Sequence, residues 1–133
     1  MLPDSSWTEV SDFSFSMLPI QINNEKIAQV LDHASRKNCW AIAFVVGTKP
    51  CFNKVYGAIQ SCLINDLPFF IINTNQHYSL ELIEGLDEFG FYEHTFVNMQ
   101  IRGDLSQKSS ELFLKTSYLA KYLNKNWPTV KVV

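Results

Sequence analysis

The sequence predicts an α/β fold, a parallel sheet flanked by helices, on the basis of two observations. Uninterrupted apolar runs at residues 39–46 and 67–73 are typical of strands that are buried on both faces of a sheet. Segments with the apolar spacing of amphipathic helices lie between and after these runs. Because strands that alternate with helices are joined by right-handed crossovers, the pattern favours a parallel sheet covered by helices.

The composition limits the classes of protein to which the chain can belong. Its 133 residues, 47% of them hydrophobic, suffice for one core of ordinary domain size. A net charge of −2 provides no strong field for nucleic acid or acidic membranes. Three cysteines without C-x-x-C spacing argue against a disulfide framework and a zinc site. The cysteine usage fits a reducing cytoplasm, and no apolar run reaches the roughly 18 residues that span a bilayer, so we expect a soluble cytoplasmic protein without nucleic-acid or membrane partner.

Residues 1–38 are predicted to form an N-terminal arm and a helix. Residues 1–20 mix Ser, Asp, Pro and isolated aromatic residues without a sustained period, so we expect an irregular arm. Asn23 or Asn24 can cap a helix that continues to about residue 37. The inward face of this helix is expected to comprise Ile27, Val30, Leu31 and Ala34.

Residues 39–133 are predicted to hold the alternating strands and helices. The run 39–46 ends at Gly47 and is expected to be the central strand. Thr48 can cap the next helix and Pro50 suits its first turn, so this helix is expected to reach about residue 65. Its inward side is expected to comprise Phe52, Val55, Tyr56, Ile59, Cys62 and Leu63.

The alternation then repeats. A second strand at residues 67–73 leads through a polar turn at 73–77 to a helix that stops at Gly90. The apolar face of this helix is expected to comprise Leu82, Ile83, Leu86 and Phe89.

A third strand is expected at residues 95–101, and a helix from residue 105 to about 124 follows the turn 102–104. Residues 130–133 have the pattern of a fourth strand that has just begun. The inward face of the last helix is expected to comprise Leu112, Phe113, Thr116, Leu119, Ala120 and Leu123.

Ligands of open α/β sheets bind at the carboxyl ends of the strands, and the turn after the first strand has the chemistry of an anion site. Gly47, Thr48 and Lys49 place N–H groups, a hydroxyl and a cation at a helix N-terminus, and Lys54 adds a second positive charge. There is neither a G-x-G-x-x-G nor a Walker pattern. The residues by themselves therefore leave two interpretations open, a phosphate site and an ordinary strand-to-helix turn.

Three more residues are expected at the same edge. Gln76 and His77 follow the second strand and Arg102 follows the third, and each is either a polar contact to a ligand or a surface residue. Cys51 with His77 as its base could form a nucleophilic pair, the alternative being a plain residue of the capping turn. Paired carboxylates are absent from these loops, so the catalytic residues stay unknown.

Three motifs occur in a fixed order along residues 41–133. They are Val45-Val-Gly-Thr-Lys-Pro50 with Lys54, then Ile72-Asn-Thr-Asn-Gln-His-Tyr78, then residues 98–102 with Leu105-Ser-Gln107. In order and spacing they resemble the start of the non-hydrolysing UDP-N-acetylglucosamine 2-epimerases, isomerases of cell-surface polysaccharide biosynthesis. Residues 1–38 lie outside the match, and residues 39–133 are interpreted as an incomplete Rossmann-like nucleotide-sugar-binding domain.

The resemblance implies the architecture called GT-B, of which this chain would form part of the N-terminal half. It implies elimination and re-addition of UDP, which interconverts UDP-GlcNAc and UDP-ManNAc without metal or nicotinamide in a usually homodimeric enzyme. Gly47, Thr48, Lys49 and Lys54 would then line the diphosphate side of the UDP-sugar cleft. Gln76, His77 and Arg102 would match positions that bind a second, activating UDP-GlcNAc.

The departures from the family pattern bear on activity. Lys49 stands where the family has arginine. The substitution replaces a planar guanidinium, which can bind a phosphate through two N–H groups, by the point charge of an ammonium group. Cys51 replaces a glutamate and Asn75 a glycine, and no Gly-Asp-Thr turn follows Val133. We therefore expect an N-terminal fragment that is inactive alone and folds marginally or self-associates, with a separate chain supplying the remaining acids and bases. Whether the chain is an enzyme stays open, and the alternatives are a stand-alone UDP-sugar-binding or regulatory module and half of a GT-B glycosyltransferase.

Overall fold

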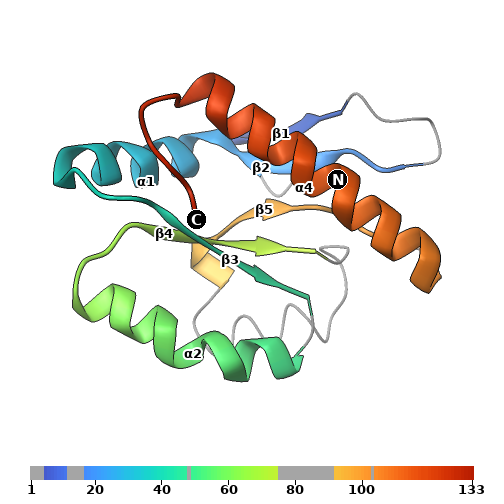
Figure 1. Cartoon of the computed structure of the whole chain (residues 1–133), viewed down its shortest axis with the longest axis horizontal. Helices are drawn as coiled ribbons and strands as arrows, with labels where there is room; N and C mark the ends of the chain where they lie inside the picture. Colours follow the sequence, from blue (N-terminus) through green and yellow to red (C-terminus); the bar gives the residue numbers. More distant parts are fainter. Residues whose placement is uncertain (1–4, 12–16, 48, 75–91, 103) are drawn as a thin grey trace.

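The computed structural model describes residues 5–11, 17–47, 49–74, 92–102 and 104–133, and within them it confirms the α/β class. Five strands form one open sheet in the order β1-β2-β5-β4-β3, with helices packed on it (Figure 1). The strands are β1 (Trp7–Val10), β2 (Ile20–Asn23), β3 (Ile42–Val46), β4 (Phe69–Asn73) and β5 (Thr95–Asn98). The helices are α1 (Asn24–Lys37), α2 (Lys49–Ile64) and α4 (Leu105–Asn126), with a 3-10 turn η1 (Tyr92–His94) before β5.

The sheet is mixed, so the expectation of a parallel sheet is right only for part of it. β3 pairs with β4 and β4 with β5 in parallel, whereas β2 pairs antiparallel with both β5 and β1. The expected irregular arm is likewise wrong where the structure describes it, because residues 7–10 form a strand and Trp7 is buried. Two four-residue strands close in sequence pair as an antiparallel ribbon, and each is too short to display a sustained apolar period.

β3 lies at the end of the strand order rather than at the centre, which corrects the prediction made from its apolar run. The side chain of Val45 is 51% exposed. On the outer side of β3, residues 131–133 add a short parallel bridge, in which the Ala43 N–H donates to the Val133 carbonyl at 2.8 Å. The predicted fourth strand is therefore present as a short segment beside β3.

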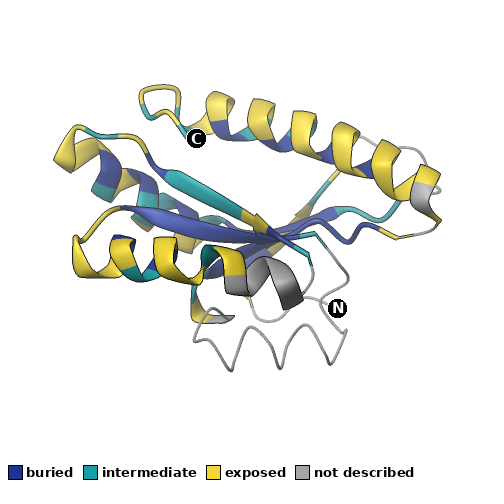
Figure 2. Cartoon of the chain, turned by 60° about the horizontal axis from the view of Figure 1, so that its bottom comes forward, coloured by how far each residue is buried: buried dark blue, intermediate teal, exposed yellow. Residues whose placement is uncertain are grey.

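Helices cover both faces of the sheet (Figures 1 and 2). α2 packs on one face over β3 and β4, and its buried residues Ile59 and Cys62 match the prediction, whereas Tyr56 and Leu63 are exposed. α1 and α4 pack on the opposite face. The core on that face comprises Ile20, Ile22, Ile27, Leu31, Ala34, Ala41, Phe70, Ile72, Phe96, Val97, Met99, Ile101, Leu119 and Leu123.

α1 forms where the sequence predicts it. The Asn23 side chain accepts a hydrogen bond from the Lys26 N–H at 3.0 Å, which caps the first turn. Asn38 caps the C-terminus of the helix, and its left-handed φ of 53° turns the following Cys39 N–H back to the Ala34 carbonyl at 3.0 Å. Ile27, Leu31 and Ala34 are buried and Val30 packs at their margin, as expected.

α4 begins and ends close to the predicted residues but presents a different face to the sheet. Leu119 and Leu123 are buried as predicted, whereas Leu112, Phe113, Thr116 and Ala120 are exposed. Glu111 and Lys115 occupy the inward positions of the first turns instead. Both faces have helical spacing, so the apolar pattern alone could not choose between them. The helix predicted to end at Gly90 lies outside the described residues.

Candidate ligand-binding edge

The carboxyl ends of the three parallel strands meet at one edge of the sheet, where their connections are hydrogen-bonded to one another. The Thr74 N–H donates to the Val46 carbonyl at 3.0 Å, which joins the ends of β4 and β3. The Ile101 N–H donates to the Thr74 carbonyl at 2.9 Å, which joins the segment after β5 to the same residue. We call Gly47, Thr74 and residues 99–102 the carboxyl edge.

The first predicted cluster reaches this edge through β3 and α2. β3 ends at Val46, Gly47 is half-buried, and α2 begins at Lys49, so the N-terminus of α2 faces the carboxyl edge. The unpaired N–H groups and the dipole of a helix N-terminus favour a negative charge there. Lys54 lies in the second turn of α2 and is exposed. Thr48 lies outside the described residues, and for Lys49 the backbone alone is described.

The second predicted cluster is only partly described. Arg102 is exposed at the carboxyl edge, directly after the turn that follows β5. β4 separates β5 from β3, and the segment before Arg102 is held against the end of β4, because the Met99 N–H donates to the Asn73 carbonyl at 2.8 Å. Gln76 and His77 lie outside the described residues, and so the pairing of Cys51 with His77 stays a prediction.

Sequence reasoning missed a row of buried amide side chains that crosses three strands at this edge. Asn73 of β4 donates through Nδ2 to Asn98 Oδ1 at 3.3 Å, and Asn98 Nδ2 donates to Gln21 Oε1 at 3.4 Å. The register pairs Asn98 with both neighbours, so the three side chains share one sheet face. Each amide thus meets part of the hydrogen-bonding need of the next, as buried polar groups require. The available signal was an asparagine at the end of two apolar strand runs.

A second missed feature is a fully buried lysine under the turn that follows β5. Lys115 Nζ donates to the Met99 carbonyl at 2.7 Å and to the Gln100 carbonyl at 3.1 Å. It also forms an ion pair at 3.1 Å with the buried Glu111 carboxylate, one helical turn earlier. Acid and base pairs at this spacing are usually solvated on a helix surface, so the sequence alone did not single this one out.

The charges around Lys115 oppose one another. Burial lowers the pKa of Lys115, the paired Glu111 carboxylate raises it, and the nearby positive charge of Arg102 lowers it. The pKa of the amine is therefore shifted below its ordinary value, and the Glu111 carboxylate limits that shift. The positive charge of Arg102 therefore acts on the buried amine of Lys115.

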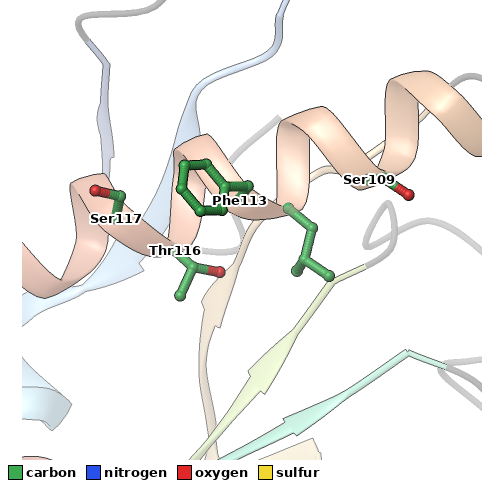
Figure 3. A pocket seen from close by; sticks show the side chains of 5 residues that line it. Ser109, Phe113, Thr116 and Ser117 are labelled. Atoms are coloured by element: carbon green, nitrogen blue, oxygen red, sulfur yellow. The ribbon is translucent and has the colours of Figure 1, made fainter.

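The outward side of α4 carries a shallow groove of about 580 Å³ (Figure 3). Phe113, whose side chain is 75% exposed, lines it together with hydroxyl side chains. The groove is lined by Ser109, Leu112, Phe113, Thr116 and Ser117.

The described residues contain no group of three or more His, Cys, Asp and Glu side chains placed to hold a metal ion. Within the described part of the chain, no helix is both long and apolar enough to cross a bilayer.

In comparisons with known proteins, no family model matches the chain, and no curated protein or solved structure matches it significantly. The resemblance to the epimerases therefore depends on the three motifs alone.

Proposed function

We propose that the carboxyl edge beside β3 binds the diphosphate of a nucleotide sugar, and that UDP-GlcNAc is the ligand its motifs favour. The observation that carries this proposal is that the two helical connections next to β3 lie on opposite faces of the sheet. α2 leads from β3 to β4 on one face of the sheet, and α4 leads from β5 back to residues 131–133 on the other face. In open α/β sheets the crevice at such a switch point is where ligands bind.

The order of the parallel segments supports the same proposal. Counted along the chain from β3, the order β5-β4-β3 followed by residues 131–133 corresponds to the 3-2-1-4 order of doubly wound, Rossmann-like sheets. This order favours the interpretation of residues 39–133 as part of the N-terminal half of a GT-B fold. β1 and β2 extend the sheet beyond β5 and leave the switch point open.

The chemistry of the edge suits a diphosphate. Gly47 lets the backbone approach a phosphate closely, the first N–H groups of α2 can donate to it, and Lys49 and Lys54 supply positive charge. A lysine at position 49 gives a point charge rather than a bidentate fork, so we expect weaker binding than an arginine would provide. Arg102 follows β5 rather than β3, with β4 between the two strands, so we assign it to a second anion rather than to the same phosphate group.

We propose binding rather than turnover by this chain alone. Two acidic residues flank the described part of the edge near Arg102, and both have structural partners. Asp104 Oδ1 accepts from the Gln107 N–H at 2.9 Å and caps α4, and Glu111 is buried in its ion pair with Lys115. Epimerisation would therefore need acids and bases from outside this described part of the edge, and we propose that a separate chain supplies them.

Titration of the 15N-labelled protein with UDP-GlcNAc, UDP and free GlcNAc tests the proposal. We expect saturable shifts of the Gly47 amide and of the first amides of α2 with UDP-GlcNAc and UDP, and none with GlcNAc. Lys49→Gln should raise Kd about tenfold, the effect of losing one contact to a charged group. Lys125→Gln, an exposed charge in the last turn of α4, is the matched control and should leave Kd unchanged.

The absence of any shift at millimolar UDP would overturn the proposal. A separate assay for UDP-ManNAc distinguishes binding from turnover. Its formation by the purified chain would contradict the non-catalytic role and leave the ligand assignment intact.

A further inference from the structure

We propose that Lys115 and Glu111 are positioning residues of the carboxyl edge: they hold the turn after β5 from beneath and thereby place Arg102 at the rim as an anion contact. The ligand-binding part of this inference rests on the proposed function, whereas the placement of the turn does not.

The turn is held at successive residues. Lys115 Nζ draws together the carbonyls of Met99 and Gln100, at 2.7 and 3.1 Å. Gln100 has a φ of 55°, a left-handed conformation that residues other than glycine adopt rarely. Its side-chain Nε2 donates to the Pro19 carbonyl at 2.8 Å, which holds it from the side of β2. An unusual backbone conformation that several partners impose indicates a turn whose shape matters.

A series of hydrogen bonds also holds the residues that follow Arg102 in the sequence. Glu111 accepts from Gln107 Nε2 at 2.8 Å, and the Gln107 N–H donates to Asp104 Oδ1 at 2.9 Å. Asp104 therefore connects through Gln107 and Glu111 to Lys115. In the sequence, Arg102 lies between Asp104 and the two residues whose carbonyls Lys115 binds. The residues on both sides of Arg102 therefore belong to the same network of hydrogen bonds and the ion pair.

A purely apolar core would not need a charged amine at this position. A leucine or methionine could fill the volume, but it would leave the Met99 and Gln100 carbonyls without their donor. Glu111 supplies the counter-charge that permits a lysine to be buried next to the like charge of Arg102. The pair thus has two roles. Lys115 donates to the carbonyls of the turn, and Glu111 compensates the positive charge of Lys115.

The first test needs no ligand. Lys115→Met keeps the length of the side chain and removes the donor, and Leu123→Ala in the same helix is the control for general destabilisation. We expect the 15N order parameters of Ile101 and Arg102 to fall and their amide exchange to quicken in Lys115→Met, but not in Leu123→Ala. Equal behaviour of these amides in the two variants would overturn the positioning role. Should Lys115→Met fail to fold, Glu111→Gln replaces it, and the same change at these amides is expected.

The second test uses UDP as the anion probe in a double-mutant cycle. Arg102→Gln and Lys115→Met should each raise Kd several-fold, roughly five- to tenfold, and Lys115→Met should add nothing when Arg102 is already glutamine. Additive effects would show that Lys115 does not act through Arg102. If the wild-type chain does not bind UDP, the proposed function fails, while the amide measurement still decides whether Lys115 places the turn.

Discussion

The side-chain nitrogen of Lys115 lies 2.7 Å from the carbonyl oxygen of Met99, deep under the turn that leads from β5 to α4. Helix α4 therefore reaches the sheet edge with a charged donor at the place where the spacing of its apolar residues predicted a leucine or phenylalanine contact. The stability of the fold and the geometry of the proposed binding edge therefore both depend on this contact.

Removal of the Lys115 amine is expected to be costly. Lys115→Met should lower the free energy of unfolding by about 3 kcal/mol, because it leaves Glu111 as a buried, uncompensated charge and two carbonyls without their donor. The double variant Lys115→Met with Glu111→Leu should cost clearly less than the sum of the single substitutions. Urea unfolding followed by circular dichroism measures all three values, and strict additivity would contradict the coupling.

Asn98 is expected to matter for the amide row as a whole, because its side chain joins the other two members. Asn98→Leu should lower the free energy of unfolding by about 2 kcal/mol, since both Asn73 and Gln21 lose a buried partner. The matched control is Asn65→Leu, because the exposed Asn65 side chain, directly after α2, donates to the Ser61 carbonyl in the last turn of that helix. The control should change stability by less than about 0.5 kcal/mol. Similar losses in both variants would show that the row is not a structural unit.

Stability is expected to depend on pH through His94. Burial against the Phe69 ring lowers the pKa of His94 below its ordinary value of 6.5, and the nearby Glu93 carboxylate only partly opposes this. The unfolded chain then takes up the proton first as pH falls, so this contribution is present above pH 6.5 and is lost as pH falls toward the lowered pKa.

The measurement for His94 is the free energy of unfolding at a series of pH values from about 7.5 to 5, in the wild type and in His94→Gln. The wild type should lose stability across this range, and the variant should lose less. An identical slope in both proteins would assign the pH dependence to other groups.

The orientation of α4 makes a direct comparison of two substitutions possible. Phe113→Ser should change the free energy of unfolding by less than about 0.5 kcal/mol, because the side chain is 75% exposed. Leu119→Ala should cost about 3 kcal/mol, because it leaves a cavity against the sheet. Chemical unfolding measures the free energy of unfolding of both variants. A larger loss in Phe113→Ser than in Leu119→Ala would show that α4 packs through the face that the apolar pattern predicted.

Local patterns predicted much of the fold and one part of the candidate site. The cap at Asn23 and the abrupt change from β3 to α2 at Gly47 each depend on neighbouring residues, so they could be identified without coordinates. The amide row could not, because Gln21 and Asn98 are 77 positions apart and their pairing is set by strand order. The buried lysine was missed for a related reason, since the same helix offers two faces of similar spacing.

The sequence by itself determined the kinds of element and their order, because hydrophobic period, caps and turn residues act over a few neighbouring positions. Only the tertiary structure decided that β3 comes last in the order of the five strands, that β2 joins β5 antiparallel, and that α4 turns Glu111 and Lys115 inward. These outcomes depend on contacts between segments distant in sequence. The inward position of Lys115, for example, gives the buried Met99 and Gln100 carbonyls a donor, a pairing that no local pattern records.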